Sequence, residues 1–258
     1  MKKFLLLSAL LISYASVFSQ CNLTLASNSS SSKLLKGTNS ITINTKLALE
    51  KIMLEKIFDI EFKLKYYSGD VAFASSNCKT SGCDGTIGLG VDLITKLLKE
   101  NEEAGYWMVL SILSHEAAHI FQYKNKITFK NTVHQEVHAD YIAGWYMGKL
   151  LDDYEGEYDF SNGTSKAFNE MWDRVQSIKE WKHDLRLFFG FLGDNNYTSI
   201  DHHGNFTTRA MAINSGMESY TNWAHPISPF DGKSRDYKKL LATNAKRFAL
   251  NYIKRYNH

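Results

Sequence analysis

The spacing of apolar and polar positions changes character along the chain. Apolar residues within 47–58 recur at roughly helical spacing, and residues 60–66 then alternate between apolar and charged side chains, as in a half-buried strand. Shorter strands are predicted at 71–74 and 86–89. From there the period is mostly helical, with helices predicted at 92–100, 101–124 and about 133–151, 164–188, 206–215 and 236–255. Early strands and late helices predict an α+β fold with a small N-terminal antiparallel sheet and a mostly helical C-terminal part.

The first 19 residues have the organisation of a secretory signal peptide. A basic start with Lys2 and Lys3 precedes a largely apolar run over 4–18 and a cleavage position before Gln20. That run is too short to span a bilayer, and no later stretch approaches the roughly 20 apolar residues required. We therefore expect an exported protein, periplasmic or secreted, with no transmembrane segment. Residues 20–40, serine-rich at 27–32, are expected to form a flexible lead-in to a single domain over 41–258.

Composition and charge narrow the function classes further. The 258 residues are 44% hydrophobic and include only 2 prolines, which excludes a disordered chain and allows one core with unbroken helices. Lys and Arg number 30 against 27 Asp and Glu, and loss of Lys2 and Lys3 with the signal peptide would leave 28 against 27. A nearly neutral protein offers no electrostatic basis for a nucleic-acid partner.

The chain has three cysteines. Cys78 and Cys83 flank a plausible turn, and in an exported protein they are expected to form a local disulfide in preference to two free thiols. Cys21 is then the odd cysteine. Cleavage immediately before it would allow a lipid anchor, although Gln20 stands where a small residue would be expected.

The chemistry is concentrated in the run His-Glu-Ala-Ala-His at 115–119. Positions i and i+4 share one helix face, so His115 and His119 can bind one ion, and zinc takes neutral imidazole nitrogens while leaving room for a water. Glu116 can accept a proton from that water. The surrounding helix is almost entirely apolar, so we expect it to be buried, where two histidines and a glutamate need a partner. The alternative is a pair of hydrogen-bonded core histidines with Glu116 exposed.

A second helix is expected to supply the third zinc ligand. Glu136 and Asp140 are again four residues apart, and the 16 residues from 120 to 135 leave room for a turn and a return helix. Glu136 is the predicted ligand, and Asp140 is predicted to accept a hydrogen bond from the far nitrogen of a ligating histidine. Two solvated carboxylates on a surface helix are the alternative. His134 and His138 share a different face of this helix, where a polar surface pair is favoured over a second metal site.

These two motifs in this order resemble gluzincin peptidases, in which a helix with two histidines precedes one with Glu and, four residues later, Asp. The run Ala-Asp-Tyr-Ile-Ala-Gly at 139–144 is similar to that of the neutral zinc metallopeptidases and of the CAAX-prenyl-endopeptidase-like families. The likeness covers about residues 85–217. It implies a zincin-like fold with one Zn²⁺ per chain held by His115, His119 and Glu136.

Those families carry a later His followed by Gly or Pro, with an Arg six positions after the His. Here His203 and Arg209 match that spacing. The resemblance implies that His203 stabilises the oxyanion and that Arg209 positions it or supports the site. His202 and His225 stay open as alternatives for that histidine.

The resemblance implies an exported zinc-dependent endopeptidase acting on a peptide or protein substrate, with a zinc-activated water and Glu116 as general base. Residues 86–90 could be an edge strand along which a substrate pairs, or an ordinary strand-to-helix turn. The alternative function is a zinc-stabilised, non-catalytic binding protein of the cell envelope.

Overall fold

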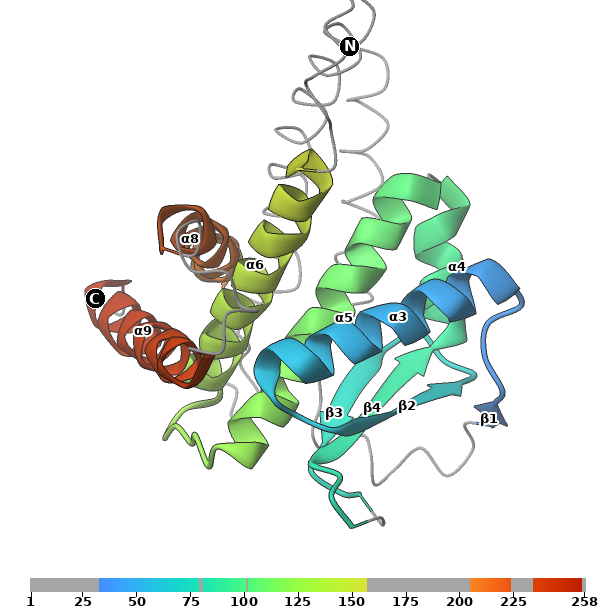
Figure 1. Cartoon of the computed structure of the whole chain (residues 1–258), viewed down its shortest axis with the longest axis horizontal. Helices are drawn as coiled ribbons and strands as arrows, with labels where there is room; N and C mark the ends of the chain where they lie inside the picture. Colours follow the sequence, from blue (N-terminus) through green and yellow to red (C-terminus); the bar gives the residue numbers. More distant parts are fainter. Residues whose placement is uncertain (1–32, 79–80, 101, 157–204, 224–233, 257–258) are drawn as a thin grey trace, which may run out of the picture.

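The computed structural model describes residues 33–78, 81–100, 102–156, 205–223 and 234–256. Within them the chain forms an α+β fold in which a sheet and its flanking helices precede a helical C-terminal part (Figure 1). The elements, in chain order, are β1 (Leu34–Leu35), α3 (Ile41–Phe58), β2 (Phe62–Tyr67), β3 (Ala72–Ser75), β4 (Gly85–Gly90), α4 (Val91–Glu100), α5 (Glu102–Lys124), α6 (Thr132–Gly156), α8 (Phe206–Trp223) and α9 (Ser234–Tyr256).

The sheet has the strand order β1-β2-β4-β3 and is mixed. β1 pairs with β2, and β3 with β4, in antiparallel fashion, whereas β2 and β4 are parallel from Phe62 opposite Gly85 to Tyr67 opposite Gly90. The prediction of an antiparallel sheet is therefore wrong for its central pair. The physical reason is that β4 has no charged side chain and is buried along its whole length, so it takes an interior position.

The interior position of β4 also excludes one of the two alternatives for residues 86–90, the edge strand; α4 begins directly after β4, at Val91. The edge next to β4 is β3, a shorter strand whose residues alternate between buried and half-buried. The predicted disulfide closes the loop between these two strands, with an S–S distance of 2.03 Å between Cys78 and Cys83.

Helix α5 is the central element of the fold. It contacts the sheet through β3 and β4 and also packs against α3, α4 and α6 (Figure 1). Residues 108–122 of this helix are all buried, as the apolar run around the histidines predicted. Since α5 is enclosed on every side, any polar group that it carries inward must be satisfied by its neighbours.

Helices α6 and α8 pack with their backbones in close contact. A Cβ added at Gly144 of α6 would lie 2.1 Å from the carbonyl oxygen of Ile213 on α8, and one added at Gly216 of α8 would lie 2.1 Å from that of Tyr141 on α6. Glycine at both positions is therefore required for the approach. Helix α9 packs against α6 as well, so α6 is buried between α5 on one side and α8 and α9 on the other.

Some of the remaining predicted segments are described by the structure, and others lie outside the described residues. Leu34–Leu35, within the predicted lead-in, pairs with β2, and Ser40 caps α3 by accepting a hydrogen bond from the Ile43 N–H at 3.3 Å. The predicted signal peptide, Cys21 and the helix predicted at 164–188 lie outside the described residues. Among the helices that the structure describes, none is long and apolar enough to cross a membrane.

Candidate metal centre

Three buried side chains from α5 and α6 converge on one point. His115 and His119, one turn apart on α5, are 2% and 5% exposed, and their Nε2 atoms lie 3.1 Å apart. Glu136 reaches them from α6, with Oε2 3.3 Å from Nε2 of His115 and Oε1 3.5 Å from Nε2 of His119. The two helices that carry the sequence motifs thus lie side by side, as their spacing predicted.

The separations of these atoms match a tetrahedral zinc site. Zinc binds imidazole nitrogens and carboxylate oxygens at about 2.0–2.2 Å, which places neighbouring ligand atoms of a tetrahedron about 3.3–3.5 Å apart. The observed distances of 3.1 to 3.5 Å bracket that value. His115, His119 and Glu136 form the one cluster of this kind found among the described residues, and it can hold a metal ion.

Asp140 contacts the ring nitrogen of His115 that is remote from the cluster, and Arg209 in turn binds Asp140. Asp140, one turn after Glu136 on α6, places Oδ1 2.9 Å from Nδ1 of His115. Arg209 of α8 donates from Nε to Oδ2 and from Nη2 to Oδ1 of Asp140, each at 2.8 Å. Asp140 and Arg209 are 0% and 1% exposed, so this bidentate pair is shielded from solvent.

The charge state of Asp140 follows from its partners. Burial acts to raise its pKa, but the positive charge of Arg209 and the hydrogen bonds from Arg209 and His115 together lower the pKa below its ordinary value. Asp140 is therefore ionised, and Nδ1 of His115 must be the protonated nitrogen that donates to it. This leaves the Nε2 lone pair of His115 directed toward His119 and Glu136.

Gln122 contacts Nδ1 of His119, as Asp140 contacts Nδ1 of His115. This glutamine was not identified from the sequence. Its Oε1 lies 2.8 Å from Nδ1 of His119, and its Nε2 lies 2.8 Å from the backbone oxygen of Gln135 and 3.0 Å from Nδ1 of His138. The side chain is fully buried. Its position three residues after His119, on the same face of α5, was the only signal available.

The two imidazoles cannot hydrogen-bond to each other in this arrangement. Nδ1 of His115 faces Asp140 and Nδ1 of His119 faces Gln122, so with both protons on Nδ1 the two Nε2 atoms face each other through lone pairs. Two lone pairs and a carboxylate within 3.5 Å repel one another unless a cation lies between them. The alternative of a pair of hydrogen-bonded core histidines with Glu116 exposed is wrong in its second part: both histidines are buried and have polar partners, but Glu116 is only 2% exposed.

His134 and His138 differ from the expected polar surface pair. His138 is 0% exposed, and burial lowers its pKa to about 3. His134 is half-buried and stacks on Phe129 at a centroid distance of 6.0 Å. The surface prediction fails because α6 is covered on both faces, by α5 and by α9.

Tyr123 is a second residue that the sequence did not bring forward. It follows His119 by one turn of α5 and is half-buried. Burial, and then the carboxylates of Glu116 and Glu136, raise the pKa of Tyr123. Its phenol consequently stays protonated. Of the other predicted residues, His203 and its alternatives His202 and His225 lie outside the described residues.

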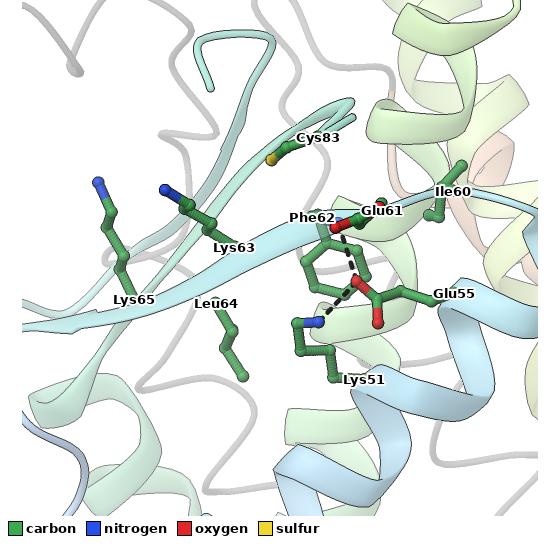
Figure 2. A pocket seen from close by; sticks show the side chains of 9 residues that line it. All are labelled: Lys51, Glu55, Ile60, Glu61, Phe62, Lys63, Leu64, Lys65 and Cys83. Carbon is green, nitrogen blue, oxygen red and sulfur yellow. Dashed lines mark hydrogen bonds and ion pairs between the residues drawn. The ribbon is translucent and has the colours of Figure 1, made fainter. Parts of the chain in front are cut away.

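A surface hollow is lined mainly by residues of α3 and β2 (Figure 2). It shares no lining residue with the metal cluster. Two of its charged groups are paired with each other: Oε1 of Glu55 accepts hydrogen bonds from Nζ of Lys51 at 2.6 Å and from the N–H of Phe62 at 2.9 Å. We therefore place the candidate chemistry at the buried cluster between α5 and α6.

Comparisons with protein-family models, with curated proteins and with solved structures find no match to this chain. The resemblance to gluzincin peptidases thus depends on the two motifs and on the geometry of the ligands that they supply.

Proposed function

We propose that this protein is an exported zinc-dependent endopeptidase. The observation that carries the proposal is the convergence of His115, His119 and Glu136 at tetrahedral separations, with Glu116 buried on the same helix. Three protein ligands leave a fourth position open, which is the pattern of catalytic zinc sites. The disulfide between Cys78 and Cys83 supports export, because such bonds persist mainly in oxidising compartments.

Each nearby side chain has a role in amide hydrolysis under this proposal. The chemistry that a bound zinc supplies is polarisation of the scissile carbonyl and a lowered pKa for an attacking water. Glu116 accepts the water proton and delivers it to the leaving amine. The protonated phenol of Tyr123 is available as a hydrogen-bond donor to the developing oxyanion, alongside the role proposed for His203.

The edge strand β3 supports an extended binding mode for the substrate. It pairs with β4 on one side and is the last strand of the sheet, and it contacts α5, the helix that carries both histidines. A peptide added along this edge would hydrogen-bond through its backbone. We expect that N-methylation of one backbone amide in a cleaved peptide will lower kcat/KM at least tenfold at the positions that pair. A peptide that tolerates N-methylation at every position would contradict this binding mode.

One observation favours a zinc-stabilised binding protein instead. The three ligands are only 1% to 5% exposed, and such burial is also typical of structural metal sites. A structural site has no use for the carboxylate of Glu116, whereas a peptidase requires it. The two candidates therefore differ in what happens when that carboxylate alone is removed.

The deciding experiment combines metal analysis with digestion of a peptide library by the wild type and by Glu116→Gln. We expect one zinc per chain in both proteins and at least 100-fold lower cleavage by the variant, because a general base contributes about 10²–10⁴-fold. Glu218→Gln, at an exposed position on α8, is the matched control and should cleave normally. Equal cleavage by Glu116→Gln and wild type would refute the peptidase mechanism.

A further inference from the structure

Gln122 has a fixed orientation between α5 and α6. A backbone carbonyl can only accept a hydrogen bond, so the atom 2.8 Å from the oxygen of Gln135 must be the amide nitrogen of Gln122. The other end of the amide is then Oε1, which faces Nδ1 of His119 at 2.8 Å. An oxygen acceptor at that position requires the proton of His119 to be on Nδ1, which leaves Nε2 free to bind a metal.

His138 fixes the same amide from the other side. Nε2 of Gln122 lies 3.0 Å from Nδ1 of His138, and because the amide nitrogen donates, that ring nitrogen must be the acceptor. His138 is therefore the tautomer protonated at Nε2. The side chain of Gln135 also donates to Oε1 of Gln122. With Gln122 and His138 both 0% exposed, no water competes for these bonds.

We propose that Gln122 is the positioning residue for His119: it holds that imidazole in the tautomer and orientation needed for metal binding, and it is itself held by His138 and the Gln135 carbonyl. The two histidines of the centre are thus oriented by different chemistry. Asp140, paired with Arg209, orients His115 through a charged acceptor, whereas His119 depends on a neutral amide. This inference uses the metal site of the proposed function but not its peptidase activity.

Two substitutions separate the positioning role from a merely structural one. Gln122→Met keeps the length of the side chain but removes every hydrogen bond, and we expect zinc affinity to fall about 10- to 100-fold. Gln122→Glu keeps an oxygen acceptor for His119 while losing the donor to Gln135 and His138. Its zinc affinity should stay within about threefold of the wild type although its unfolding midpoint is lower. Ser111→Ala is the control, because it removes a buried hydrogen bond of α5, from Ser111 Oγ to Met108 O at 2.7 Å, and leaves the hydrogen bonds of Gln122 in place.

The assay is competition for zinc with a chromogenic chelator, alongside urea unfolding of each variant. Long-range ¹⁵N–¹H NMR of the metal-free protein should show His119 protonated at Nδ1 and His138 protonated at Nε2. In Gln122→Met the His119 signal should shift toward a mixture of tautomers. This spectroscopic change would not accompany a general loss of packing.

The outcomes for the inference and for the proposed function are distinguishable. Gln122→Met with wild-type zinc affinity, or His119 found protonated at Nε2 in the wild type, would overturn the inference alone. Zinc affinities of Gln122→Met and Gln122→Glu that fall together with stability would also overturn it. A wild type that binds zinc but cuts no peptide would overturn the peptidase and leave the inference standing, whereas a wild type without zinc would overturn both.

Discussion

Replacement of Arg209 by methionine would leave the carboxylate of Asp140 buried without its main cationic partner. The bidentate contact consists of two hydrogen bonds of 2.8 Å between side chains that are 1% and 0% exposed. Methionine fills much of the same volume, so the change is chiefly electrostatic. Removing one partner of a buried pair costs about 3–5 kcal/mol, because the remaining charge stays desolvated. We expect a loss of that size in the free energy of unfolding at pH 7.

The pH dependence of this loss provides a stricter test. In the wild type the pKa of Asp140 is lowered, so its contribution to stability is present above the ordinary value of 3.8 and is lost as the pH falls through the lowered pKa. Without Arg209, burial dominates and the pKa of Asp140 should rise above that ordinary value. The variant should then be most destabilised at neutral pH and approach the wild type as Asp140 becomes protonated toward pH 4.

Urea unfolding of chelator-treated protein at pH 7 and pH 4.5 measures both effects. Lys51→Met is the control, because it breaks an i,i+4 ion pair of 2.6 Å with Glu55 that is partly exposed to solvent and should cost about 1 kcal/mol or less. A loss for Arg209→Met no larger than that of the control, or one independent of pH, would refute the reasoning. The double variant with Asp140→Asn should lose less than the sum of the two single changes.

Two other substitutions test the packing around the centre. Gly144→Ala should lower stability by about 3 kcal/mol or more in thermal unfolding, because its Cβ would lie 2.1 Å from the Ile213 carbonyl oxygen; an unchanged midpoint would contradict the close approach of α6 and α8. When the pH is lowered from 7 to 4.5, the free energy of unfolding of the wild type should fall by about 2–3 kcal/mol more than that of His138→Gln. The pKa of His138 is lowered to about 3, so the unfolded wild type takes up a proton below about pH 6.5 that the folded protein does not. Superimposable pH profiles would rule out a neutral, buried His138.

Short-range spacing was sufficient to identify the main groups of the candidate metal centre. His115 and His119 share a helix face because they are four residues apart, and Glu136 and Asp140 do so for the same reason. The disulfide was predictable in the same way, since Cys78 and Cys83 are separated by only five positions. Each of these inferences depends on geometry within a single element or loop.

Gln122 and Arg209 show where such reasoning stops. In the sequence, Gln122 is only one of several polar residues of α5. Its amide is oriented by the Gln135 carbonyl and by His138, which both belong to α6. Arg209 was singled out by its spacing of six positions after His203. Its bond to Asp140, however, joins residues 69 positions apart and depends on the contact between α6 and α8. Neither partner could be assigned from the pattern of a single helix.

The sequence by itself determined which side chains could bind a metal, because the α-helical period places residues i and i+4 together wherever the helix lies. Only the tertiary structure decided that β4 lies inside a mixed sheet and that His138 is buried. It also decided that Nε2 of His115 and Nε2 of His119 face the carboxylate of Glu136 at 3.3 and 3.5 Å. These features depend on how separate elements pack, and burial against a neighbour, unlike helical spacing, is not encoded in any local repeat.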